Sequence, residues 1–195
     1  MAQATPVSND SARSVSGVES AIGRKARPAP GEVAPMFSLP DADMEAFDLA
    51  EVTRSHIVVL YFYPRDSMPS SLRQAIEFSD AGEIFEQCSA IPVGVSLDDC
   101  LVHGEFCDRH GLGVTLLSDP DASVCRLYGV WQEREVGGTI KPDVQRAIFI
   151  IGRDGFIHHT FEDWSQSSHT DEILGLIQEL ARSRNGNRQE HRRHA

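Results

Sequence analysis

The sequence predicts an α/β protein in three layers, with a mixed central sheet and helices on both of its faces. Short β-branched and aromatic runs such as Ile57–Tyr63 show no polar alternation, which is typical of strands covered on both faces. These runs alternate with longer segments of helical periodicity, and such alternation indicates parallel strands joined by helical crossovers.

Five strands are expected in the folded part of the chain. They span Ile57–Tyr63, Ile91–Ser96, Thr115–Leu117, Arg146–Ile151 and Phe156–Phe161. The sequence Arg153-Asp154-Gly155 separates the last two, which indicates a hairpin that closes the sheet.

Helices are expected between the strands and at the end. One begins near Pro69, because proline lacks the N–H that goes unbonded in a first helical turn. Its apolar side is expected to hold Leu72, Ala75, Ile76, Ile84, Phe85 and Cys88. Another is capped by Asp98 or Asp99 and ends at Gly111. A brief helix covers residues 121–127 and the last spans Thr170–Arg182, which completes the layout of a thioredoxin-like fold.

The chain is expected to fold as one domain over residues 31–182, between a flexible arm at 1–30 and a basic flexible tail at 183–195. The net charge is −11, with +2 on residues 1–30 and +4 on residues 181–195, so residues 31–180 carry −17. Residues 31–180 are acidic enough to repel nucleic acid and anionic membranes, so neither is expected as a partner.

The N-terminal sequence and the cysteine pattern indicate the cellular compartment of the protein. The N-terminus has no basic patch followed by an apolar stretch, and the longest apolar run is far below the roughly 20 residues of a membrane span. Four cysteines, Cys88, Cys100, Cys107 and Cys125, show neither C-x-x-C nor zinc-finger spacing. We therefore expect a cytoplasmic protein with free thiols and no metal.

The turn Pro64–Ser71 is the expected ligand site. Ligands of open α/β sheets bind beyond the carboxyl ends of the strands, and this turn joins a buried strand to a helix. The free N–H groups and partial positive charge of a helix N-terminus stabilise an anion or lower the pKa of a thiol.

At this turn the sequence resembles a known family. YFYPRDSMPSSLRQAIEF at residues 61–78 is similar to the active-site segment of peroxiredoxins, in particular the bacterioferritin-comigratory (PrxQ-type) group, which reads YFYP-x-x-x-T-P-G-C-T-x-E. The stretches APMFSLPD, VSLDDCLVHGEFCDRHGL, LLSDPDASVCRLYGVW and RAIFIIGRDGFI also resemble this group, so the similarity covers about residues 33–180. It implies a peroxiredoxin fold and reduction of hydroperoxides with a thioredoxin-type reductant. It also implies no cofactor, and a monomer or weak dimer.

The resemblance carries over only in part at the active site. Pro64 falls on the proline that shields the pocket, and Arg146 falls on the arginine that stabilises the peroxidatic thiolate and polarises the peroxide. However, Met68 stands at the catalytic threonine and Ser71 at the peroxidatic cysteine. The position of the resolving cysteine holds Ile76.

These differences matter because peroxide reduction needs a sulfur nucleophile that becomes a sulfenic acid and is then restored by a thiol. A serine hydroxyl is a weak nucleophile without a base, and the motif contains no histidine to serve Ser71. Three explanations stay open: a laboratory replacement of a native cysteine, a naturally degenerate relative, or a peroxidase that uses Cys100 or Cys107.

Cys107 is four residues from His103 and three from His110, so imidazoles on its helix face could lower its pKa; alternatively, it simply packs in the core.

The alternative to an enzyme is a non-enzymatic binding module. It would use the helix N-terminus and Arg146 to hold a small anion or an acidic group of a partner. The segment WQEREVGGTIKP at residues 131–142 either flanks the pocket or is a flexible connection.

Overall fold

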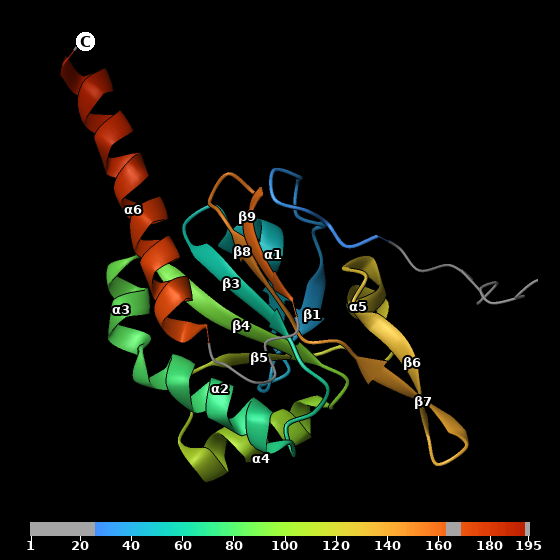
Figure 1. Cartoon of the computed structure of the whole chain (residues 1–195). Coiled ribbons are helices and arrows are strands. Elements are labelled where there is room, and N and C mark those ends of the chain that lie inside the picture. The colour runs from blue at the N-terminus through green and yellow to red at the C-terminus, as the bar shows by residue number, and fades with distance from the viewer. Residues whose placement is uncertain (1–25, 163–168, 194–195) are drawn as a thin grey trace, which may run out of the picture.

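The computed structural model of the protein describes residues 26–162 and 169–193, and these form a thioredoxin-like α/β fold (Figure 1). The five strands of the central sheet lie in the order β5-β4-β3-β8-β9. Their bounds are Ile57–Phe62 for β3, Ala90–Ser96 for β4, Thr115–Ser118 for β5, Ala147–Ile151 for β8 and Ile157–Glu162 for β9. Because β3, β4 and β5 are parallel while β8 and β9 are antiparallel additions, the predicted mixed sheet is confirmed.

Helices cover both faces of the sheet, and each face has its own apolar core. Alternate residues of β3 divide between the two cores: Val58 and Leu60 face one, whereas Val59 and Tyr61 face the other. The helices on the Val59 side are α2 (Pro69–Asp80), α3 (Gly82–Gln87), α4 (Cys100–His110) and α6 (Thr170–Arg193). The helices on the Val58 side are the short α1 (Leu49–Val52) and α5 (Ser123–Leu127).

The caps of α4 are those that the sequence indicates. The Asp99 side chain accepts a hydrogen bond from the backbone N–H of Val102, and Gly111 ends the helix with φ +62°. Glycine has no Cβ to clash in this left-handed conformation, so the helix can end there without strain.

The segment that starts at Pro69 differs from its prediction, because two helices replace one. Ala81 (φ −85°, ψ 7°) separates α2 from α3. Ile76 does not join the core, since 39% of its surface is exposed. Ser71 and Gln74 lie instead on the buried side of α2, together with Ala75 and Phe78.

Two short hairpins were not expected from the sequence. β1 (Ser38–Pro40) pairs with β2 (Ala46–Asp48), and β6 (Trp131–Val136) pairs with β7 (Thr139–Val144). The turn of the second hairpin is Gly137-Gly138, with φ +60° and +77°, as a two-residue turn of this kind requires. Residues 131–142 are therefore a β-ribbon in the structure.

Helix α6 continues past the expected end at Arg182 to Arg193. In the described residues no helix is long and apolar enough to cross a membrane. Residues 1–25 of the predicted arm lie outside the described residues.

Candidate active site

The turn after β3 and the residue before β8 meet at one edge of the sheet. The chain leaves β3 through Tyr63 and Pro64 and enters α2 at Pro69. Strand β8 runs antiparallel to β3, with Ala147 opposite Phe62, so Arg146 lies beside the start of this turn. This pairing brings together two residues that are 75 positions apart, Ser71 and Arg146.

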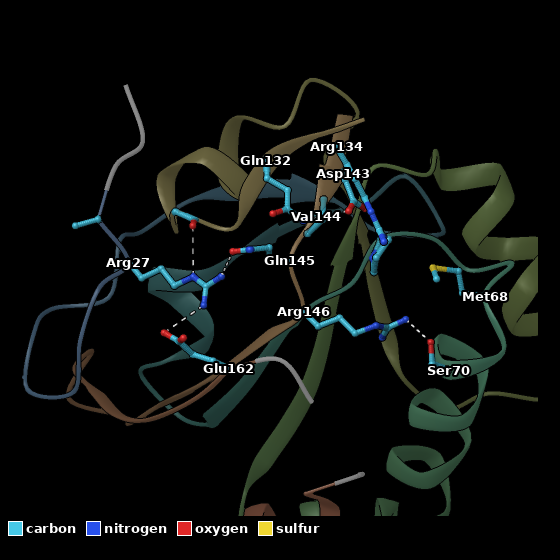
Figure 2. A pocket seen from close by; sticks show the side chains of 13 residues that line it. Arg27, Met68, Ser70, Gln132, Arg134, Asp143, Val144, Gln145, Arg146 and Glu162 are labelled. Atoms are coloured by element: carbon cyan, nitrogen blue, oxygen red, sulfur yellow. Dashed lines mark hydrogen bonds and ion pairs between the residues drawn. The ribbon is translucent and has the colours of Figure 1, made fainter. Parts of the chain in front are cut away.

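Arg146 holds the first turn of α2 by two hydrogen bonds. Its Nη2 donates to Ser70 Oγ at 2.6 Å (Figure 2). The same nitrogen donates to Ser71 Oγ at 2.9 Å. Both Arg146 and Ser71 are buried, with 7% and 3% of their surfaces exposed. The guanidinium and the helix N-terminus therefore place positive charge at the Ser71 hydroxyl.

A pocket of about 970 Å³ opens beside this cluster. It is lined on this side by Pro64, Met68, Ser70 and Arg146, so three of the four predicted site residues line it. Ser71 follows Ser70 in the chain and accepts a hydrogen bond from the same arginine. Figure 2 shows Arg134 reaching from β6 toward the space bordered by Met68 and Arg146. Residues 131–142 thus flank the pocket.

The other side of the pocket is closed by Arg27, which belongs to the predicted arm. Its side chain hydrogen-bonds the side chain of Gln145 and the backbone oxygen of Gly129, and it forms an ion pair with Glu162 at 3.2 Å. These contacts attach the Arg27 side chain to the end of β9 and to the chain at Gly129 and Gln145.

Ser71 lacks the partner that would make it a nucleophile. In the part of the chain that the structure describes, neither a histidine nor a carboxylate is hydrogen-bonded to Ser71 Oγ. Arg146 is a donor only, so it does not act as the base. Met68 provides no side-chain hydrogen bond at the N-cap of α2, where a threonine hydroxyl would supply one.

A buried polar network, which sequence reasoning missed, fixes the turn that carries Met68. Asp66 Oδ1 accepts a hydrogen bond from the Tyr63 hydroxyl at 2.7 Å, and Asp66 Oδ2 lies 2.7 Å from His103 Nδ1. His103 Nε2 lies 3.2 Å from the backbone oxygen of Leu117, and the backbone N–H of Asp66 donates to Asp98. Burial, together with the nearby Asp66, raises the pKa of Tyr63 well above its usual range.

Two of the four cysteines, Cys107 and Cys125, do not have the electrostatics of a peroxidatic cysteine. Burial, together with the charges of Asp66 and Asp108, raises the pKa of Cys107 to about 11, the opposite of the lowering that His103 and His110 could have produced. His103 faces the core and Asp66 instead. Burial and the charge of Asp119 also raise the pKa of Cys125. Among the described residues no group of His, Cys, Asp or Glu side chains is arranged to hold a metal.

The fold and the pocket define a thioredoxin-like protein whose site lies between a buried strand and a helix N-terminus. Comparison with known proteins agrees with this class. The profile of the AhpC/TSA family matches residues 30–160. Peroxiredoxin Bcp of Escherichia coli is 35% identical over 151 residues, which cover 77% of this chain and 96% of that protein.

Solved structures give the same result. A Cys-to-Ser mutant of PrxQ from Xylella fastidiosa superposes with a TM-score of 0.73 at 28% identity, covering 80% of this chain and 99% of that one. The bacterioferritin comigratory protein of Xanthomonas campestris superposes with a TM-score of 0.68 at 26% identity, covering 74% and 92%. The chain belongs to the AhpC/TSA family and to its Bcp/PrxQ group of peroxiredoxins. Membership implies a peroxide substrate and a thioredoxin-type reductant.

Proposed function

We propose that this protein keeps the hydroperoxide-binding pocket of its family and has lost the catalytic cycle. The observation that carries the proposal is the environment of Ser71. Its hydroxyl lies where a peroxidatic sulfur would receive the hydrogen bond of Arg146, but no base among the described residues activates it. Serine has no counterpart to the sulfenic acid that a thiol forms and a reductant removes.

Binding, in contrast, does not require the sulfur. The Xanthomonas campestris structure is described in terms of alkyl peroxide reduction activity. In this chain Pro64 and Arg146, which fall on the family's motif positions by resemblance, line the pocket. A peroxide oxygen can accept hydrogen bonds from Arg146 or Ser70 whether or not a thiolate is present.

The test is hydroperoxide consumption in the presence of thioredoxin and thioredoxin reductase. We expect no turnover by the unchanged chain and turnover by Ser71→Cys, because Arg146 and the helix N-terminus would stabilise a thiolate at that position. Met68→Thr combined with Ser71→Cys is expected to be more active, since the threonine hydroxyl adds a donor at the N-cap. Ser70→Cys is the matched control: it puts a thiol beside Arg146 but one residue out of position, and should stay inactive.

Turnover by the unchanged chain would contradict the proposal and would favour the use of another thiol. Cys107→Ser and Cys100→Ser would then show which one. If Ser71→Cys restores full activity without a second change, a replaced native cysteine becomes the better explanation of Ser71.

A small anion is a second candidate ligand for the same pocket, because of the charges on the β6–β7 ribbon. Arg134 and Lys141 are register partners, so two cations lie directly opposite each other. Like charges in such pairs destabilise a hairpin unless an anion is bound nearby. Titration with inorganic phosphate, followed by calorimetry, tests this candidate. Arg134→Gln is expected to weaken binding, and Arg109→Gln, which changes an exposed side chain on α4, is the control.

The cytoplasmic location and the monomeric or weakly dimeric state stay predictions. Fractionation of the source cells and sedimentation of the purified chain are the direct measurements for them.

A further inference from the structure

One of the described residues that line the pocket carries a sulfur atom, and this sulfur is a thioether. Met68 lines the pocket together with Ser70 and Arg146. It is the residue directly before α2, and 39% of its surface is exposed, so solutes can reach it. In Figure 2 its side chain borders the same space as the guanidinium groups of Arg134 and Arg146.

We propose that Met68 is an oxidation site, at which a hydroperoxide held by Arg146 and Ser70 transfers one oxygen atom and leaves methionine sulfoxide. The inference goes beyond the proposed function but rests on one part of it, namely that the pocket admits hydroperoxides. The chain would then respond to peroxide once per molecule rather than consume it in a cycle.

The chemistry balances without a further reactant. The sulfur lone pair attacks the terminal peroxide oxygen, an S–O bond forms and the O–O bond breaks. The proton of that oxygen passes to the other oxygen, which leaves as an alcohol, or as water when the oxidant is hydrogen peroxide. The thioether is oxidised by two electrons and the peroxide is reduced by two. Methionine sulfoxide reductases reverse such a change.

The pocket supplies what an exposed methionine elsewhere lacks. The guanidinium of Arg146 is positioned by Ser70 and Ser71, and a fixed cation stabilises the negative charge that develops on the leaving oxygen. Holding the peroxide beside the thioether also removes part of the entropy cost of their encounter.

The product would change the pocket. A sulfoxide oxygen accepts hydrogen bonds, whereas a thioether is a weak acceptor. Formed beside Ser70, Arg134 and Arg146, this oxygen would compete with an incoming oxyanion for the same donors. Oxidation of Met68 is therefore expected to weaken the binding of phosphate or peroxide in the pocket.

Two other methionines are internal controls within the chain. Met44 lies in the turn between β1 and β2 with 70% of its surface exposed, and Met36 is 41% exposed. If exposure alone decided the rate, Met44 would oxidise first and Met36 would match Met68. The proposal predicts the reverse order, with Met68 reacting about tenfold faster than Met44, the effect of one charge-assisted hydrogen bond in the transition state.

The experiment treats the full chain with hydrogen peroxide, and separately with cumene hydroperoxide, and follows each methionine by peptide mass spectrometry. Faster oxidation of Met68 in the folded chain, which disappears in urea, supports the proposal. Equal rates for Met68 and Met36, or a faster rate for Met44, overturn it. Since this comparison lies within one molecule, it needs no variant to fold.

Two substitutions test the role of the donor. Arg146→Gln should remove the advantage of Met68 while leaving the rates of Met36 and Met44 unchanged. Arg109→Gln, an exposed change on α4, should leave all three rates unchanged. Retention of the Met68 advantage in Arg146→Gln would contradict the assigned role of the guanidinium. Peroxide consumption far beyond the methionine content of the chain would instead contradict the proposed loss of turnover, so the two failures are distinguishable.

Discussion

At residue 71 a hydroxyl occupies a site whose electrostatics favour an anion. Arg146 donates to it at 2.9 Å and the helix N-terminus lies beside it, yet a serine hydroxyl does not ionise near neutral pH. The same surroundings would lower the pKa of a thiol. At this position the proposed loss of activity therefore comes down to oxygen in place of sulfur, while the contacts from Arg146 and the helix N-terminus remain.

The Cys107 thiol is expected to react slowly, and this gives a pH prediction. Because its pKa is raised to about 11, roughly one molecule in a thousand carries the thiolate at pH 8. Its alkylation rate should therefore rise about tenfold for each pH unit and show no plateau up to pH 10. Iodoacetamide labelling followed by mass spectrometry measures this rate, with circular dichroism as the check that the fold persists.

The urea-unfolded chain is the reference for this measurement, since its thiols should level off near an ordinary pKa of about 8.5. A plateau for Cys107 below pH 9 in the folded chain would mean that the thiol is activated, and would revive the hypothesis that it serves as the nucleophile.

The individual residues of the pocket could be predicted from the sequence only where a motif contains them. Pro64, Met68, Ser71 and Arg146 follow from the family pattern. Arg27 and Arg134 could not be found in this way, because each reaches the pocket through a tertiary contact: one from the chain before β1 and the other from a ribbon whose pairing brings it there. The protonation of Cys107 could not be predicted either, since it depends on which face of α4 is buried.

Among the elements, the turn between β3 and α2 is held by a side chain from α4. His103 is fully buried, and its two ring nitrogens face Asp66 and the backbone oxygen of Leu117. This contact links the turn that carries Met68 to both α4 and β5. The two ring nitrogens of His103 keep their hydrogen-bond partners only if the turn, α4 and β5 all stay in place.

Removal of the imidazole should therefore be costly. We expect His103→Leu to lower the free energy of unfolding by about 3 to 5 kcal/mol, because it leaves the buried Asp66 carboxylate with the Tyr63 hydroxyl as its remaining side-chain partner. Tyr63→Phe should lower it less, by about 1 to 2 kcal/mol, since one neutral donor is lost. Urea denaturation at neutral pH measures both.

The double variant Asp66→Ala with His103→Leu separates this network from simple packing. If the two side chains stabilise the turn together, the double variant should be less destabilised than the sum of the single ones. Strict additivity would show that they act independently.

The prediction of elements from the sequence succeeded where local signals are strong. The buried strands, the Asp99 and Gly111 caps of α4 and the closing hairpin of β8 and β9 all have such signals. The break at Ala81 and the hairpin of β1 and β2 do not, because packing against the rest of the chain decides them. The pair Gly137-Gly138 was a signal for the β6–β7 turn, but the polar strands on either side of it concealed the pattern.

For the whole molecule, one sheet separates two cores, and both depend on it. Buried residues of β3 and β8 contribute to each core on alternate sides. Loss of packing on one face therefore weakens the strands that the other face needs. The molecule is expected to unfold as a single cooperative unit.

A pair of substitutions tests this coupling. Leu117→Ala removes packing from one core and Ile177→Ala from the other, and each should lower the free energy of unfolding by about 2 to 5 kcal/mol. In both variants tryptophan fluorescence and far-ultraviolet circular dichroism should report one coincident urea transition. Leu101→Ala, with 69% of that side chain exposed, is the control and should change little. Two separated transitions in either core variant would show that the faces unfold independently.

The β6–β7 ribbon differs from the rest of the molecule in how it is attached. It pairs with no strand of the central sheet in the described residues. The hydrogen bond from Gln145 N–H to the Val130 oxygen closes its base. Val144 is buried in the Val58-side core, Trp131 packs against that core, and Arg126 stacks on Trp131. Beyond this anchor, residues 133–135 and 137–142 are exposed, and Arg134 borders the pocket. A segment grafted from another relative between Gln132 and Asp143 would alter which molecules the pocket admits while Trp131 and Val144 keep their places in the core, so new ligand preferences can arise in this architecture without passing through unstable intermediates.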